Sequence, residues 1–156
     1  MGSIRRITVV GSRAVDLIGA IAASGYMLLV IAMFIGRIFG CLEVGHWIGI
    51  VSSLILVPLA YLFIVGTRTG RRTIYLVWLT LMFVFSLFEL IADQILRVDF
   101  RGIQWAVILY VMFFFAATGG MIGVAAQAGR RWAMLASALF LIMGVLAFVQ
   151  RAITGL

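Results

Sequence analysis

The sequence predicts an all-α integral membrane protein: a bundle of five transmembrane helices joined by short loops. Three observations lead to this prediction. First, long stretches without charges fill most of the chain, each near the roughly 20 residues that a helix needs to cross a bilayer. Second, these stretches are apolar on all sides, whereas helices of a soluble bundle need a polar face. Third, the breaks between the stretches are short and carry arginines.

The first two helices are expected at 14–37 and 47–67. The first apolar stretch is longer than the h-region of a signal peptide, about 7 to 15 residues, so we expect it to remain in the protein. The second helix has Pro58 at its middle. Proline should leave a carbonyl near residue 54 without a partner and kink the helix there, and a hinge is the alternative interpretation.

The remaining helices are expected at 73–96, 103–127 and 132–150. The third contains Glu89 but resumes its apolar pattern directly afterwards, so we interpret it as one helix. The connection between the last two is short, which predicts an antiparallel hairpin. No linker or second soluble unit interrupts the pattern, and residues 1–156 are expected to form a single transmembrane domain.

The distribution of arginines predicts the orientation. All 12 basic residues are arginines, and this usage without lysine fits a GC-rich genome. Eight lie on the side of the amino terminus and of the second and fourth connections, and four lie on the other side. By the positive-inside rule, the amino terminus is cytoplasmic and the carboxyl terminus is outside. The predicted location is a cell membrane, of the bacterial inner-membrane type.

Composition argues against several kinds of chemistry. The only cysteine, Cys41, allows no intramolecular disulfide and no CxxC redox pair. The only histidine, His46, offers no second histidine for haem and too few ligands for zinc. The net charge of +7 comes from arginines beside helix ends, without a motif that reads nucleic acid. We therefore expect no cofactor, no metal, no nucleic-acid partner and no catalytic residues.

Small residues predict where helices pack closely. Gly119, Gly120 and Gly123 lie together in the fourth helix, and Gly19 and Ala23 have the same four-residue spacing in the first. Such faces let helix backbones approach each other inside a membrane. A chain with 17 glycines also produces this spacing by chance, and the pattern leaves open whether the contact is internal or between subunits.

The most informative polar residues are Glu89, Asp93 and Arg97, which are four apart and share one stripe of the third helix. Helical rise from Arg72 places Glu89 about 25 Å from the cytoplasmic interface, within the hydrocarbon. A carboxylate facing lipid at that depth is disfavoured by several kcal/mol. Glu89 must therefore face the bundle, form a pair or be protonated.

Arg37 is a candidate partner for this acidic stripe, because helical rise along the first helix brings it to the level of Asp93. His46, in the first outer loop, is expected at a similar height. One interpretation is an outward-facing polar site for a proton, a cation or a polar ligand. The alternative is an ionic lock between Arg37 and the stripe, which we favour because paired charges near helix ends explain the pattern more simply.

The remaining polar residues are assigned structural roles. Arg13 and Asp16 are three apart and are expected to pair at the inner interface. Hydroxyl side chains within the helices are expected to bond to backbone carbonyls one turn back. These side chains belong to Ser24, Tyr26, Thr80 and Thr118.

Three functions remain after these exclusions. The leading hypothesis is a non-catalytic accessory or scaffold subunit, which packs against a membrane-protein partner through its helix faces. The alternative is a small oligomeric transporter or channel that uses Glu89 and Asp93 for protons or cations. The third is a lipid-active membrane enzyme with Glu89 as general acid. The expected partners are the lipid bilayer and either another membrane protein or further copies of this chain.

Overall fold

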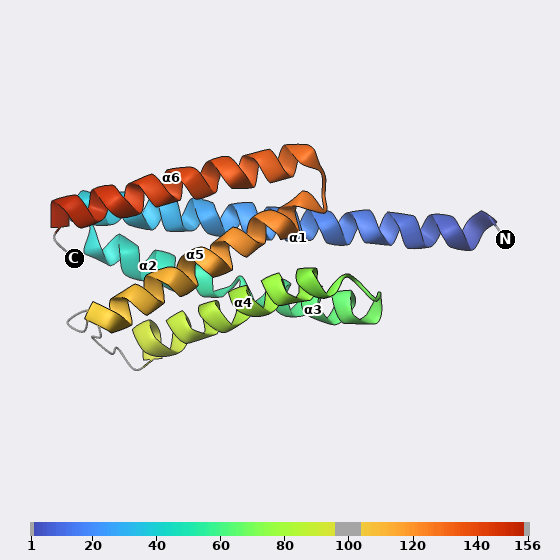
Figure 1. Cartoon of the computed structure of the whole chain (residues 1–156), viewed down its shortest axis with the longest axis horizontal. Helices are drawn as coiled ribbons and strands as arrows, with labels where there is room; N and C mark the ends of the chain where they lie inside the picture. Colours follow the sequence, from blue (N-terminus) through green and yellow to red (C-terminus); the bar gives the residue numbers. More distant parts are fainter. Residues whose placement is uncertain (1, 96–103, 155–156) are drawn as a thin grey trace.

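The computed structural model describes residues 2–95 and 104–154, and these ranges contain helices but no strand (Figure 1). The helices are α1 (Gly2–Ile38), α2 (Leu42–Ser53), α3 (Leu56–Arg68), α4 (Thr73–Glu89), the π-helix η1 (Leu90–Ile95), α5 (Gln104–Ala126) and α6 (Arg130–Thr154). Five spans are long and apolar enough to cross a membrane, as the sequence predicts. These are Arg13–Ile38, Trp47–Arg68, Thr73–Ala92, Gln104–Ala126 and Arg130–Ile153.

Helix α1 lies at the centre of the bundle and packs against α2, α3, α5 and α6. In the most apolar part of the α1 span, 44% is buried inside the bundle. The corresponding share is 17% in the α2–α3 span and 17% in the α6 span. Side chains with no exposed surface come from five helices and form one core. They include Met27, Leu62, Met82, Phe85, Ala117 and Met143. The α2–α3 span and α6 therefore present most of their apolar surface outward.

The helix of the second span is interrupted at Leu54 and Ile55, both of which keep right-handed helical backbone angles. Helix α2 ends at Ser53 and α3 begins at Leu56, with a turn between them. Pro58 is the third residue of α3 and lies in its first turn. The N–H groups of a first turn have no carbonyl partner within the helix, so the N–H that proline lacks is not missed there. The expected orphan carbonyl near residue 54 does not occur, because the Leu54 carbonyl accepts the Val57 N–H at 3.2 Å.

Other boundaries also differ from the sequence-based expectation. Helix α1 begins at Gly2 and α2 at Leu42, so His46 belongs to a helix and not to a loop. Helix α4 ends at Glu89, and the chain continues as η1 instead of one α-helix to 96. Hydropathy locates the apolar part of a helix, whereas helical hydrogen bonding also continues through polar residues, which explains the longer helices.

The connection between α3 and α4 is fixed by the backbone. Gly70 has a φ of 64°, in the left-handed region that favours glycine. The Arg71 N–H donates to the Gly66 carbonyl at 3.0 Å, and the Gly70 N–H donates to the Thr67 carbonyl at 3.4 Å. This pair of bonds is a Schellman motif, which satisfies the last carbonyls of α3. It also sets the direction in which Arg71 leaves the turn.

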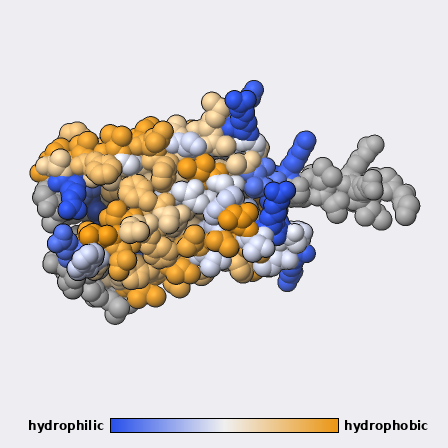
Figure 2. Space-filling model, in the orientation of Figure 1, coloured by the Kyte–Doolittle hydropathy of each residue, from blue (hydrophilic) through white to orange (hydrophobic). Residues whose placement is uncertain are grey.

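One end of the bundle is marked by arginines, and we call it the arginine-rich end (Figure 2). It comprises the α3–α4 and α5–α6 connections and the part of α1 near Asp16. Its exposed arginines are Arg13, Arg68, Arg72, Arg130 and Arg131. The exposed side chains between this end and the opposite one are mainly apolar.

Candidate functional site

The structure surrounds the Glu89 carboxylate with two tyrosine hydroxyls, and we call these three residues the Glu89 cluster. The Tyr26 hydroxyl of α1 donates to Glu89 Oε2 at 3.2 Å. The Tyr110 hydroxyl of α5 donates to Glu89 Oε1 at 2.7 Å. The cluster thus links three helices through one acid, and both carboxylate oxygens accept a hydrogen bond.

The position of Glu89 follows from the buried face of α4. Buried residues of α4 recur at helical spacing and include Leu79, Met82 and Phe85, and Glu89 continues the same face one turn later. The Phe85 ring lies 5.5 Å from the Tyr110 ring and 5.3 Å from the Phe113 ring. Aromatic packing therefore holds the Tyr110 ring in place beside Glu89.

The backbone changes its hydrogen-bonding pattern directly after Glu89. The π-helix η1 begins at Leu90 and packs against α2 as well as continuing α4. A π-helical turn accommodates an extra residue and shifts the side chains that follow, and such turns are frequent at functional sites. Glu89 is therefore the last residue on the α-helical register of α4, next to a local irregularity of the helix.

Only part of the predicted polar site can be compared with the structure. Arg37 lies in the last turn of α1. The side chains of Asp93 and His46, and the whole of Arg97, lie outside the described part of the chain. The ionic lock between Arg37 and the acidic stripe therefore stays a prediction.

Spacing along the sequence did not reveal that Tyr26 and Tyr110 donate to Glu89. The prediction assigned the Tyr26 hydroxyl to a backbone carbonyl, but a phenol stands too far from its own helix for that bond and instead reaches Glu89 across the bundle. Tyr110 was given no role. A usable signal was present, because Tyr26 and Tyr110 each lie within an apolar helix, far from the interfaces where tyrosine is common.

The inner hydroxyl groups divide into two kinds. Thr80 donates to the Leu76 carbonyl at 2.9 Å and Thr118 donates to the Phe114 carbonyl at 2.7 Å, which confirms the predicted backbone bonds. Ser24 does not follow this prediction, because its buried hydroxyl has no partner in the described chain. The buried hydroxyl of Ser86, one turn before Glu89, also has none there.

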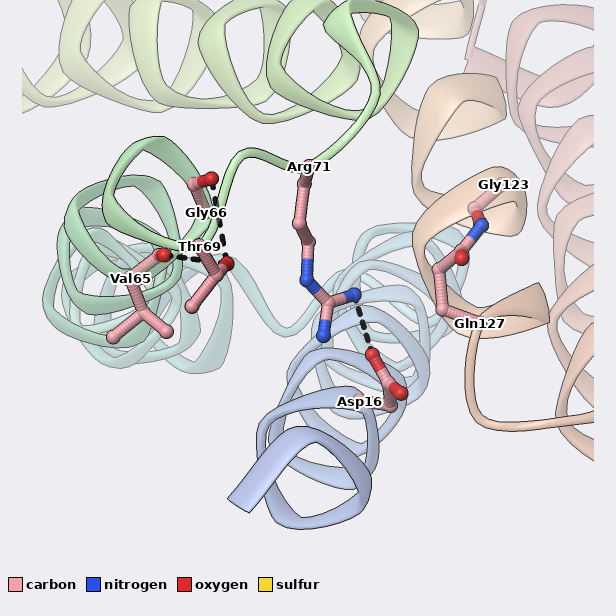
Figure 3. A network of polar contacts seen from close by, with 7 residues as sticks. All are labelled: Asp16, Val65, Gly66, Thr69, Arg71, Gly123 and Gln127. Carbon is pink, nitrogen blue, oxygen red and sulfur yellow. Dashed lines mark hydrogen bonds and ion pairs between the residues drawn. The ribbon is translucent and has the colours of Figure 1, made fainter. Parts of the chain in front are cut away.

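At the arginine-rich end, Asp16 of α1 pairs with Arg71 from the α3–α4 connection at 2.5 Å (Figure 3). The predicted pair with Arg13 is wrong, because Asp16 faces the turn whose direction Gly70 sets. Arg71 and Asp16 are each 16% exposed, and the Arg71 guanidinium lies 4.9 Å from the centre of the Tyr75 ring. This contact ties α1 to the α3–α4 connection.

The glycines of α5 lie against aromatic rings of the same chain. A Cβ at Gly120 would come within 3.0 Å of Trp78 in α4, and one at Gly123 would overlap the ring of Trp78. A Cβ at Gly119 would be 3.7 Å from Phe140 of α6, an ordinary contact. The Trp78 ring thus occupies the space that the absent side chains of Gly120 and Gly123 leave.

The corresponding small residues of α1 also face the interior. A Cβ at Gly19 would come within 3.0 Å of Val124 in α5. Ala23 has no exposed surface. Both residues lie on the α1 surface that meets other helices of the bundle.

Within residues 2–95 and 104–154, no three His, Cys, Asp or Glu side chains lie close enough together to hold a metal ion. Comparison with protein families, curated proteins and solved structures finds no match to this chain. The class that fold and site define is a bundle of five apolar spans, compatible with a transmembrane domain, in which the Glu89 carboxylate bonds to two neighbouring helices.

Proposed function

We propose that the five spans cross a lipid bilayer with the amino terminus in the cytoplasm and the carboxyl terminus outside. The exposed arginines of the arginine-rich end support this orientation, since positive charge accumulates on the cytoplasmic side of membrane proteins. We assign the membrane to the bacterial inner-membrane type. A carboxyl-terminal reporter that is active only in the cytoplasm should be silent, whereas the same reporter at the amino terminus should be active. The opposite result would reverse the orientation.

We further propose that the protein is a non-catalytic accessory subunit of a membrane assembly. The observation that carries this proposal is the Glu89 cluster, in which both carboxylate oxygens accept hydroxyls from neighbouring helices. Glu89 can therefore serve to hold neighbouring helices together, and this role explains an acid within the bundle without a bound ligand. Large apolar side chains remain outward on the least buried spans, where a membrane partner can pack. They include Leu54, Val57, Leu141, Val145 and Phe148.

Purification from native membranes in mild detergent tests this function. An accessory subunit should copurify with one membrane protein at fixed stoichiometry, and Phe148→Ala, at an outward position, should weaken that association more than Gly25→Ala. Glu89→Gln should retain the partner. Purification as a monomer or as a homo-oligomer alone would contradict the accessory function.

A second candidate function is proton transport. It is favoured by the buried hydroxyls of Ser24 and Ser86, which have no hydrogen-bond partner in the described chain. Ser86 lies one turn from Glu89 toward the arginine-rich end, and Ser24 is buried in α1 near Tyr26. Buried hydroxyls without partners are unfavourable unless water or a proton pathway uses them. In this function, Glu89 would bind and release the proton, and the hydroxyls would extend the pathway toward the cytoplasm.

Ion flux into liposomes that contain the purified protein separates the two functions. Transport through Glu89 requires flux in the wild type, loss of flux in Glu89→Gln, and retained flux in Asp16→Asn, which changes an acid at the other end. An accessory subunit should give no flux in any of the three, while all remain folded by circular dichroism. Equal flux in all three variants would contradict both functions.

A further inference from the structure

The arginine-rich end contains a hollow of about 370 Å³ between α1, the start of α4 and the end of α5. Its lining combines charged, polar and aromatic side chains. They are Asp16, Arg71, Arg72, Ile74, Tyr75, Trp78 and Gln127. Neither the Glu89 cluster nor the proposed partner surface uses this hollow. It would lie at the level of the cytoplasmic headgroups in the proposed orientation.

Two sources of positive potential meet at the hollow, Arg72 and the amino terminus of α4. Arg72 is exposed and forms no ion pair among the described residues, whereas Arg71 offsets Asp16. Arg72 is also the N-cap residue of α4, and its side chain makes no capping bond. The Tyr75 N–H donates to the Arg72 carbonyl at 2.9 Å, whereas the N–H groups of Thr73 and Ile74 before it receive no acceptor from the N-cap side chain. Helix amino termini with adjacent arginines are suited to phosphate oxygens.

Tyr75 supplies an independent observation. The residue is 2% exposed and lines the hollow, yet its buried hydroxyl has no hydrogen-bond partner in the described chain. A phenol in this state is costly unless something supplies an acceptor. Arg71 covers the face of its ring and Gly66 of α3 lies beside its edge, so the ring is held in position.

We propose that this hollow binds a phosphate group, with Arg72 and the α4 amino terminus neutralising its charge and the Tyr75 hydroxyl donating a hydrogen bond. The phosphate belongs either to the headgroup of an anionic lipid or to a free phosphate ion. Trp78, next to Tyr75 in the lining, would contact the glycerol region of a lipid. Gln127, in the turn that follows α5, donates its side-chain amide to the Gly123 carbonyl at 3.4 Å, and this amide can also contribute to binding.

The test measures binding to the full chain in neutral detergent, by native mass spectrometry and by the shift of the unfolding temperature. The probes are short-chain phosphatidylglycerol, phosphatidylcholine of the same chain length, and inorganic phosphate. We expect Arg72→Gln to weaken phosphatidylglycerol binding about fivefold, as for the loss of one surface arginine. Tyr75→Phe should weaken binding about tenfold. Arg131→Gln, an exposed arginine outside the lining, is the matched control and should bind like the wild type.

The probes also separate the two sources. Saturable phosphatidylglycerol binding that millimolar inorganic phosphate does not displace assigns the site to lipid, whereas displacement by inorganic phosphate assigns it to the free ion. Without any probe, Tyr75→Phe should unfold at the same temperature as the wild type or higher, because it removes an unsatisfied hydroxyl. Equal weakening by Arg131→Gln, or unchanged binding in both Arg72→Gln and Tyr75→Phe, would overturn the proposal.

Discussion

The two acids of the bundle whose partners are described receive opposite kinds of partner. Glu89, at the end of α4, accepts hydrogen bonds from the hydroxyls of Tyr26 and Tyr110. Asp16, at the arginine-rich end, pairs with a guanidinium. Both contacts link α1 to helices that follow later in the chain. They differ in the donors that the structure shows, which are tyrosine hydroxyls at Glu89 and an arginine guanidinium at Asp16.

This difference follows from the cost of burying charge. A hydroxyl donor inside the bundle brings no charge of its own that must lose its hydration, so Tyr26 and Tyr110 can bond Glu89 at low cost. Near the bundle end, water and headgroups lie within reach, and the long stem of Arg71 can bring its charge to Asp16 without burying it fully. Position along the helix therefore determines which partner is favourable for an acid. The predictions below change one contact at a time.

The largest effect is expected from Gly123→Leu, which acts on the α4–α5 contact that positions one partner of Glu89. Leucine would overlap the Trp78 ring and separate the two helices, so we expect a loss of more than about 3 kcal/mol in unfolding free energy. Thermal unfolding in detergent measures this loss. Gly25→Leu is the matched control, because a Cβ there meets nothing within 4 Å. Equal stability of the two variants would show that Trp78 yields without cost, whereas partial rescue by Trp78→Ala would support the contact.

The next effect is expected from Tyr110→Phe, which removes one hydroxyl of the Glu89 cluster and keeps the ring. We expect a loss of about 2 kcal/mol, typical of a hydrogen bond to a charged group. Tyr61→Phe, at an exposed tyrosine of α3, is the control and should be nearly neutral. The double variant Tyr110→Phe with Glu89→Gln should lose less unfolding free energy than the sum of the losses in the two single variants, because the two side chains are in contact. Additive losses would show that the bond contributes no stability.

The smallest effect is expected from Asp16→Asn, about 1 kcal/mol, because Arg71 can move toward headgroups once its partner is lost. Raising the salt concentration should reduce this loss, since screening weakens charge pairs near water. The loss caused by Tyr110→Phe should change little with salt, because its contact lies in the apolar interior. A common salt dependence of both variants would contradict the difference between the two ends.

The sequence predicted the five spans well because long apolar stretches depend only on composition and on the length of a helix. Pro58 predicted an irregularity near residue 54, but the particular turns that interrupt the second span there could not be predicted, since hydropathy does not record them. The sequence also selected Glu89 as the informative acid, because a charge within an apolar stretch is rare.

The partners of both acids could not be predicted in the same way. Which helices face Glu89 depends on how α1 and α5 pack, and periodicity in one helix does not contain this information. The pairing of Asp16 with Arg71 depends on the left-handed turn at Gly70, whereas sequence spacing alone favours the nearer Arg13. Local spacing predicts contacts within a helix, and tertiary packing can replace them.

The Glu89 cluster also has a consequence for the order of synthesis. Tyr26 precedes Glu89 by 63 residues, and Tyr110 follows it by 21. At about 5 to 20 residues per second, the ribosome completes Tyr26 several seconds before Glu89. When the nascent carboxylate arrives, one of its donors is already available in the first helix, and the second follows within seconds. Glu89 is therefore translated after Tyr26 and before Tyr110. The time during which only one of these two donors is available to it is short.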